Sequence, residues 1–397
     1  MARARTLAEA YRHFGEVDAA GISPLYERVA VTLSESGAAL RAIEAAPARQ
    51  RRPAVILAAL HDLALAGRAP ALAAAYADGD GGAAARAAVD TLLRMTGAVV
   101  TAAVRRPPRP GETGRGAVLY PAIAEAARRA GAHAVGLIDV GCSAGLSLSV
   151  DRVGISYSTG PPLGDPASPV QLSCTVVGGR PVPARPVPEV VARVGIDLDP
   201  VDVTDADNAR WLRACVWPDQ RERAAQLDAE IALAATAPPL LLPGDAIDVL
   251  PDAFARVPAG AMPVVITTWA LSHFPLESRL RFLHRLDQAE AGRWRGCQRR
   301  ESASPRRYRP WATAGPRATA SSAWPCSTGR PCTPRPSAAA GRRAACWRGW
   351  PAPRSRSPSG AGAIRLPEPV CSGGCPRFRD GSGCRACSAG VAGCRLR

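Results

Sequence analysis

The chain has 397 residues, enough for two domains, and 47% of them are apolar, which supports a sizeable core. No stretch of 18 apolar residues is free of a charge or a chain break, so we expect no membrane span. The first residues lack the apolar stretch of a secretory signal, and we therefore expect a cytoplasmic protein.

The formal net charge of +16 suggests a nucleic-acid-binding protein, but the distribution of the charge does not. Residues 290–397 hold 21 Arg and 4 acidic residues, whereas residues 1–289 hold 29 Arg and 30 acidic residues. Most of the cysteines also lie after residue 290, and the three in the body are typical of a reduced compartment. Because the body is almost neutral, we expect no specific nucleic-acid partner.

Residues 290–397 are rich in Arg, Pro, Gly and Cys and show no apolar periodicity. Three interpretations are open: a disordered basic tail, a zinc module built on Cys371, Cys375, Cys384 and Cys387, and a translation of the wrong reading frame. The chain contains no Lys, whose codons are AT-rich, so the gene is GC-rich. Back-translating residues 292–298 with G or C in most free codon positions and starting two bases later can give Ala-Val-Ala-Trp-Val-Ser, a plausible buried strand. We therefore expect an out-of-frame, irregular C-terminal quarter without a packed core and without a metal site.

Residues 5–130 have the pattern of helices and predict an N-terminal helical domain over residues 1–131. Pro53 is placed at a helix start, with Gly67 as its stop, and Gly131 closes the last helix of this part. His61 lies on an apolar helix, where a packed core histidine is more common than a ligand. Arg115 follows a Pro/Gly/Arg loop, where a solvated charge is the commoner outcome and contact with a site is the alternative.

After residue 131 apolar strand patterns alternate with helical ones, which predicts a parallel α/β sheet of Rossmann type over residues 132–289. Two added strands are expected near 154–158 and 170–177. The expected sheet strands lie at residues 134–140, 191–196, 240–242 and 264–268, and the expected helices at 207–216, 219–235 and 276–289.

Four short segments follow the expected strands, where open α/β sheets bind ligands. The first segment is a loop of small residues, which lets the backbone approach a ligand. The second contains an acid at a strand end, which can accept hydrogen bonds from both hydroxyls of a ribose. The third can meet an adenine edge, and the fourth lies where a substrate would sit. These candidate cofactor-binding residues are, in chain order, Asp139, Gly141, Ser143, Gly145, Asp197, Asp199, Asp245, Ala246 and Thr268, with Trp269 and His273 as candidate catalytic residues.

Taken in this order, the four segments resemble the cofactor motifs of class I S-adenosylmethionine-dependent methyltransferases. That resemblance implies S-adenosylmethionine as the cofactor and a small-molecule methyl acceptor. The position where the methyltransferase loop usually has its central glycine is Ser143 in this chain.

A second resemblance covers about residues 10–289. The chain is similar to the actinobacterial domain of unknown function 2332 family, which implies the fold and leaves the activity open. The segments that carry the similarity are residues 23–27, 50–53, 141–152, 195–205, 209–218 and 244–246.

Two other functions stay open. Residues 141–145 also match the Gly-x-Ser-x-Gly nucleophile elbow of serine hydrolases, with Ser143 as nucleophile and Asp245 and His273 following in the required chain order. The preceding helices offer no Gly-rich oxyanion loop, however. A non-catalytic or degenerate Rossmann-like binding protein is the other alternative.

Overall fold

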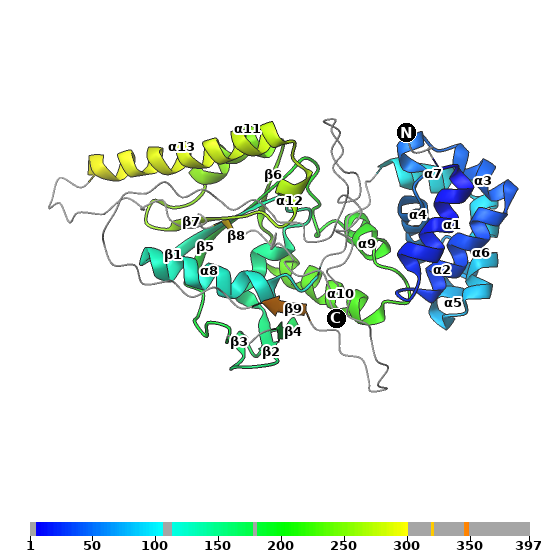
Figure 1. The fold of residues 1–397 in the computed structure, drawn as a ribbon, viewed down its shortest axis with the longest axis horizontal. Coiled ribbons are helices and arrows are strands. Elements are labelled where there is room, and N and C mark those ends of the chain that lie inside the picture. Colours follow the sequence, from blue (N-terminus) through cyan, green and yellow to red (C-terminus); the bar gives the residue numbers. More distant parts are fainter. Residues whose placement is uncertain (1–4, 106–112, 178–180, 301–318, 321–344, 349–397) are drawn as a thin grey trace, which may run out of the picture.

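The computed structural model describes residues 5–105, 113–177, 181–300, 319–320 and 345–348 (Figure 1). The four cysteines of the possible zinc module, and most of the expected out-of-frame region, lie outside these residues.

The N-terminal part is a bundle of helices. Thr6 opens its first helix with a capping box, in which the Thr6 hydroxyl accepts from the Glu9 N–H and the Glu9 carboxylate accepts from the Thr6 N–H. The elements are α1 (Leu7–His13), the π-helix η1 (Phe14–Ala19), α2 (Pro24–Glu35), α3 (Gly37–Glu44), the 3-10 helix η2 (Ala48–Gln50), α4 (Pro53–Leu65), α5 (Pro70–Asp78), α6 (Gly81–Arg94) and α7 (Thr96–Arg105).

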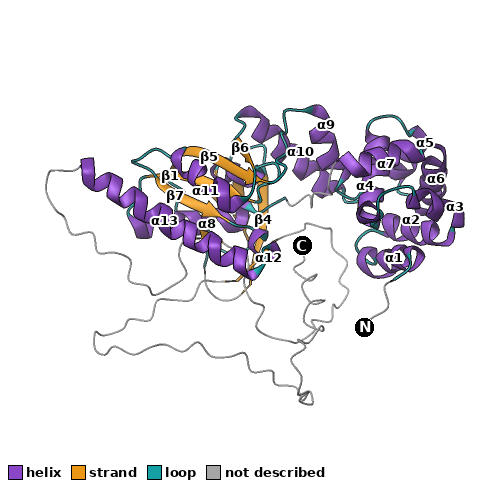
Figure 2. Ribbon diagram, turned by 90° about the horizontal axis from the view of Figure 1, so that it is seen from above, coloured by secondary structure: helices purple, strands orange, loops and turns teal. Residues whose placement is uncertain are grey.

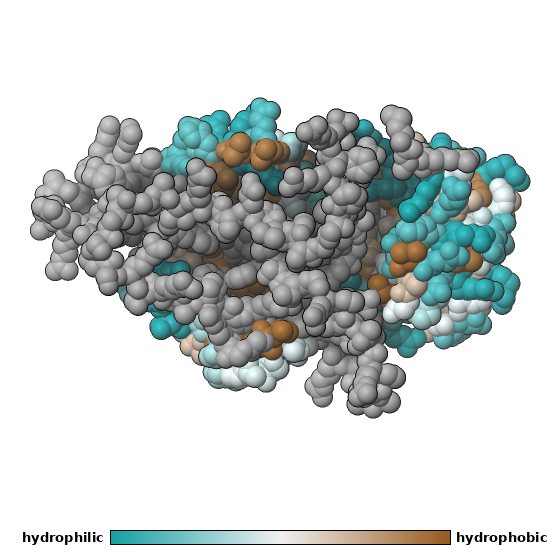
Figure 3. Space-filling model, viewed as in Figure 1, coloured by the Kyte–Doolittle hydropathy of each residue, from teal (hydrophilic) through white to brown (hydrophobic). Residues whose placement is uncertain are grey.

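Helix α4 forms the centre of this bundle. It begins at Pro53 and is followed by Gly67 in the left-handed conformation, as expected from the sequence. All its residues from Val55 to Ala64 are buried, which explains why the helix is apolar on every face. The visible surface of the bundle is mostly hydrophilic, with small hydrophobic spots (Figure 3).

A parallel sheet follows the bundle. Its strands are β1 (Ala134–Val140), β5 (Glu189–Asp197), β6 (Leu240–Pro243), β7 (Met262–Ile266) and the two-residue β8 (Thr319–Ala320), in the spatial order β6-β5-β1-β7-β8. Numbered within this sheet alone, the order is 3-2-1-4-5, the order of a doubly wound sheet. The strand order reverses at β1, so the ligand-binding crevice is expected at the carboxyl end of that strand.

Helices cover both faces of the sheet (Figures 1 and 2). On one face α11 (Ala246–Ala255) and α13 (Leu276–Arg300) pack against alternate residues of β1, β5 and β7. On the other face α8 (Gly116–Ala130) and the 3-10 helix η3 (Leu146–Arg152) pack against the remaining residues. The short α12 (Ala270–His273) follows β7 at the carboxyl edge.

A second sheet contains β2 (Gly154–Tyr157), β3 (Leu163–Gly164), β4 (Gln171–Val177) and β9 (Ala345–Arg348), in the order β3-β2-β4-β9. Its first three strands are inserted in the chain between β1 and β5. The two strands expected at 154–158 and 170–177 are thus confirmed as β2 and β4.

The C-terminal quarter differs from the expectation in its described part. Helix α13 continues to Arg300, beyond the expected end at residue 289, and β8 and β9 pair with the open edges of β7 and β4. Edge strands present unpaired backbone groups, and pairing with them needs no particular side-chain pattern. This is why a search for apolar periodicity did not detect β8 and β9.

Helices α9 (Ala206–Ala214) and α10 (Arg221–Thr236) lie between the sheet and the bundle (Figures 1 and 2). Trp211 and Ala214 on one side of α9 belong to the core of the bundle, whereas Ala209 and Leu212 belong to a cluster with α10. The helix is therefore part of two hydrophobic cores.

Polar contacts reinforce this junction. Arg210 pairs with Asp62 at 2.9 Å, and the Ser23 hydroxyl donates to the Asp219 carboxylate at 2.7 Å. His61 is buried, and its Nδ1 lies 3.2 Å from the carbonyl oxygen of Ala214, which makes it a packed core histidine as expected. Arg210 also pairs with Asp207 at 2.6 Å, on its own helix.

In the described part of the chain, no single helix has both the length and the apolar composition to cross a bilayer. Two bent helix pairs of the bundle, α4 with α5 and α6 with α7, pass that test jointly on length and composition alone.

Candidate functional site

The loop after β1 is folded tightly onto the end of β5. The N–H groups of Gly141 and Cys142 both donate to the Ile196 carbonyl, at 2.8 and 3.2 Å. Gly141 and Gly145 have φ angles of 70° and 68°, the left-handed region in which glycine carries no steric penalty. A Cβ on Gly141 would lie 2.9 Å from the Cβ of Ala270, so the loops after β1 and β7 are in close contact.

Strained backbone is concentrated at this edge. Ser143 with φ 52° and Trp269 with φ 63° are the non-glycine residues with positive φ among those the structure describes. They lie in the loops after the adjacent strands β1 and β7. Such conformations cost about 1–3 kcal/mol each and cluster at functional sites.

Asp197 at the end of β5 holds the loop after β1 in place through hydrogen bonds. Its Oδ2 accepts the Ser143 N–H at 2.9 Å, and its Oδ1 accepts the Asp199 N–H at 3.0 Å. A carboxylate offers about four lone-pair positions, which is why one side chain can accept from two backbone N–H groups at once. The Asp197 side chain is half-buried, and Asp199 is exposed beside it.

Asp245 follows β6 and caps α11. Its Oδ1 accepts the Ile247 N–H at 2.8 Å, and Ala246 is buried at the first position of the helix. The exposed carboxylate and the first-turn amides face the edge that also holds Asp197, since the Gly244 N–H donates to the Asp197 carbonyl at 2.9 Å.

A buried polar cluster lies at the ends of β1 and β7. Asp139 and Thr268 are 1% and 3% exposed, and the Arg115 guanidinium donates to the Thr268 hydroxyl. The side-chain atoms Asp139 Oδ1 and Thr267 Oγ1 are buried without a hydrogen-bond partner in the described part of the chain. Leaving buried polar atoms unpaired is costly, so this cluster is suited to a polar ligand.

Burial shifts the pKa values of the ionisable side chains in this cluster. Desolvation raises the pKa of Asp139 to about 7, with Arg115 opposing the shift and Asp197 adding to it. Desolvation also lowers the pKa of Arg115 and raises the pKa of Glu230 on α10. Glu230 accepts the Gly114 N–H at 3.0 Å, and a cavity of about 20 Å³, large enough for one water molecule, is lined by Arg115 and Glu230.

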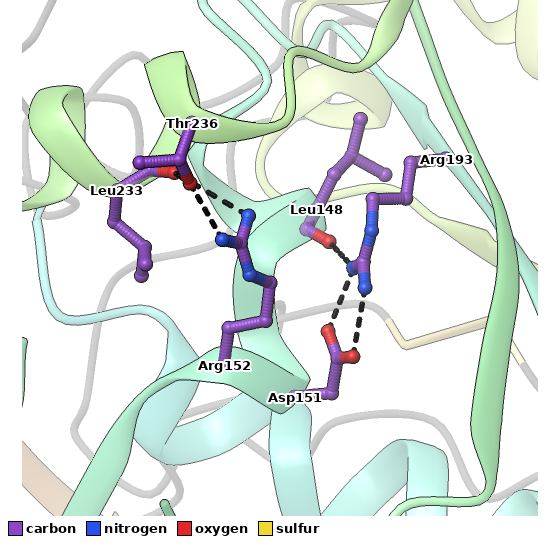
Figure 4. A network of polar contacts seen from close by, with 6 residues as sticks. All are labelled: Leu148, Asp151, Arg152, Arg193, Leu233 and Thr236. Carbon is purple, nitrogen blue, oxygen red and sulfur yellow. Dashed lines mark hydrogen bonds and ion pairs between the residues drawn. The ribbon is translucent and has the colours of Figure 1, made fainter. Parts of the chain in front are cut away.

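The segment after the Gly-rich loop, η3, is held by side-chain contacts to β5 and to α10 (Figure 4). Arg193 of β5 makes a bidentate pair with Asp151 at 2.7 and 2.8 Å and also donates to the Leu148 carbonyl. Arg152 donates to the Thr236 hydroxyl at 2.6 Å and to the Leu233 carbonyl at 3.3 Å, both on α10.

This segment corrects one expectation. In place of a short helix offering its N-terminal amides to a ligand, the chain forms the seven-residue 3-10 helix η3, with non-helical angles at Ser149. The Leu148 N–H already bonds to the Gly145 carbonyl, and β2 begins directly after Val153. The inserted sheet thus leaves no room for a longer helix.

The candidate catalytic residues lie at the rim. Trp269 is half-buried, and His273 is exposed at the end of α12. Among the described residues, no hydrogen bond joins any two of Ser143, Asp245 and His273, the residues of the hydrolase alternative; Asp245 instead caps α11.

A family profile described as "Uncharacterized protein conserved in bacteria (DUF2332)" matches residues 8–301. The chain belongs to this family. Neither the curated proteins nor the solved structures contain a significant match to this DUF2332 chain. The match spans the bundle, strands β1, β5, β6 and β7 of the parallel sheet, and the loops that follow these strands.

Two residues of the DUF2332 site were not assigned to it from the sequence. Arg115 was expected as a solvated charge, and Glu230 was not singled out at all. Both lie outside the segment that contains Asp139, and no local sequence pattern connects them to it. The sequence feature that could have indicated Arg115 is its place between two glycines directly before a helix. In the described part of the chain, no group of three His, Cys, Asp or Glu residues could hold a metal ion.

Proposed function

We propose that this DUF2332 protein binds S-adenosylmethionine at the carboxyl edge of β1, β5 and β6 and resembles class I methyltransferases, with a small-molecule acceptor still to be identified. The observation that carries the proposal is Asp197, an acid at the end of the second strand of a 3-2-1-4-5 sheet, hydrogen-bonded to a left-handed loop after the first strand.

Each part of the edge has a role in this proposal. Asp197 and Asp199 would accept the ribose hydroxyls, and Asp245 and Ala246 would meet the adenine. The loop from Gly141 to Gly145 allows close approach of the ligand. The unpartnered Asp139 Oδ1 supports the fit, because it requires a hydrogen-bond donor that the described residues do not supply.

Calorimetry with S-adenosylmethionine and S-adenosylhomocysteine tests the proposal. Asp197→Ala should abolish binding, since the ribose loses its acceptor and the loop its brace, and Asp199→Ala should weaken it less. Asp252→Asn, which removes an exposed charge on α11, is the matched control and should bind normally. Unchanged binding in both ribose variants would exclude the ribose role, and no binding by the unmutated chain would overturn the proposal.

Ser143 offers a second candidate function. Its positive φ is a feature of nucleophile elbows as well as of cofactor loops. Ser143→Gly separates the two, because glycine suits the φ of 52° and should keep S-adenosylmethionine binding intact. A fluorophosphonate probe that labels the unmutated chain, but not Ser143→Gly, would favour the hydrolase instead.

A binding protein without methyl transfer is the remaining alternative. It predicts calorimetric binding of S-adenosylmethionine with no S-adenosylhomocysteine formed when pools of small metabolites are added. Formation of S-adenosylhomocysteine that requires one pool component would identify the acceptor and exclude a purely binding role.

We also infer that the residues after about 290 are translated out of frame in this chain. The change in charge and composition there, and the strand-like sequence two bases away, support this inference.

A further inference from the structure

The residues just before α8 bring a cation into the polar edge from outside the sheet. We call residues 113–115 the strap. Gly114 has a φ of 81°, and the next residue, Arg115, reaches across to the hydroxyl of Thr268 at the end of β7. Arg115 is thus held next to the strand end at which Asp139 is buried, and the charge of Asp139 acts on it.

A buried atom at this point indicates a missing partner. Asp139 Oδ1, at the end of β1, has no hydrogen-bond partner among the described residues. Asp139 is 1% exposed, so bulk water does not satisfy it. A ligand group that enters here has to offer a donor to Asp139.

The charges specify the chemistry of that group. A guanidinium binds a carboxylate through two parallel N–H···O bonds, and a buried carboxylate such as Asp139 favours an ammonium. A group that carries a carboxylate and an ammonium on the same carbon atom can bind both residues. The α-amino acid end of a ligand has this arrangement, whereas a dinucleotide or free adenosine does not.

We propose that Arg115 determines ligand specificity by binding the α-carboxylate of the ligand's amino acid end, and that Glu230 positions Arg115 by holding the strap at Gly114. This inference rests on the proposed function, because it assigns one end of the same ligand.

Glu230 acts through the backbone. Its Oε1 accepts both the Gly114 N–H at 3.0 Å and the Gln226 side-chain amide at 2.9 Å. The carboxylate thereby fixes the residue directly before Arg115 to α10, which η3 and Arg152 also join. Glu230 is a positioning residue, since its contacts are with the strap.

The test compares S-adenosylmethionine with decarboxylated S-adenosylmethionine. The second compound keeps the adenosine, the sulfonium and the amino group and lacks only the carboxylate. The unmutated full chain should bind S-adenosylmethionine more tightly, on the order of 10- to 100-fold, the usual value of a charged hydrogen-bonded contact.

Three variants separate specificity from folding. Arg115→Met should lose this preference while its affinity for the decarboxylated compound stays unchanged. Arg115→Lys should keep part of the preference, because the charge remains without the bidentate geometry. Glu230→Leu should reduce the preference and Glu230→Gln should retain most of it, since glutamine still offers an acceptor to Gly114.

The outcomes distinguish the two proposals. A chain that binds neither compound overturns the proposed function. A chain that binds both with equal affinity, or an Arg115→Met variant that keeps the preference or weakens both compounds alike, overturns the role of Arg115 and leaves the cofactor site standing.

Discussion

At the scale of single residues, the buried carboxyl group of Asp139 makes the free energy of unfolding depend on pH. Burial raises its pKa from 3.8 to about 7, so the folded chain holds this proton more tightly than the unfolded chain does. Between about pH 4 and pH 7 the unfolded chain has released the proton and the folded chain has not. The contribution of Asp139 to the free energy of unfolding therefore falls as the pH rises through this window.

Asp139→Asn should remove that pH dependence. Asparagine is close in shape and never ionises, so the variant should match the unmutated chain near pH 4 and gain on it by on the order of 2–4 kcal/mol at pH 8. Urea unfolding at the two pH values measures the difference, with Asp199→Asn as the exposed control. An equal stability difference at both values would show that Asp139 is ionised throughout.

At the scale of elements, the position of the Gly-rich loop depends on the pinning of η3. The Arg193–Asp151 pair is largely buried, with side chains 18% and 22% exposed. Breaking one partner of such a pair leaves a charge without compensation. Arg193→Met should lower the free energy of unfolding by about 1–3 kcal/mol, and it should also weaken S-adenosylhomocysteine binding, because η3 begins directly after the loop and holds its end in place.

The exposed pair Arg12–Glu35 provides the control. Its side chains are 51% and 57% exposed and 3.6 Å apart, so Arg12→Met should change stability by less than about 1 kcal/mol. If Arg12→Met and Arg193→Met changed the affinity for S-adenosylhomocysteine equally, the role assigned to η3 would be contradicted.

The sequence was sufficient to locate the main strands of the parallel sheet, but it did not predict the contacts between elements that are distant in sequence. Apolar runs located β1 at its observed residues and β5, β6 and β7 within two residues, since buried strands and their glycine boundaries are local patterns. The 3-10 form of η3 follows from the strand directly after it, and the Glu230–Gly114 bond spans 116 positions. Such features depend on the packed fold and leave no local signal.

At the scale of the whole molecule, α9 ties the bundle to the sheet. Trp211 is 2% exposed and completes the bundle core although it lies far beyond the bundle in sequence. Trp211→Ala should destabilise the bundle by about 3–5 kcal/mol, and hydrogen exchange in α4 should report it. Leu198→Ala, at a residue 77% exposed, is the control and should leave α4 protection unchanged. Protection in α4 that survives Trp211→Ala would show that the bundle is stable without α9.

The open edge of the sheet gives a prediction about the C-terminal residues. In the described part, β7 is covered on its outer side by the two-residue β8 alone. An edge of this kind is a site of aggregation. Restoring the alternative reading frame near residue 290 should supply further strands and raise the soluble fraction on expression, measured against the chain as it stands. An unchanged soluble fraction would count against the frame interpretation.

The dual packing of α9 has a consequence for synthesis on the ribosome. The bundle is translated first, but Trp211 and Ala214 of its core are added roughly 100 residues later, which at 5–20 residues per second is a delay on the order of 5–20 seconds. During that interval the surface of α4 that receives Trp211 stays uncovered while β1 and the inserted strands are made. The nascent chain thus exposes an apolar surface of the bundle until α9 has been synthesised and can pack on it.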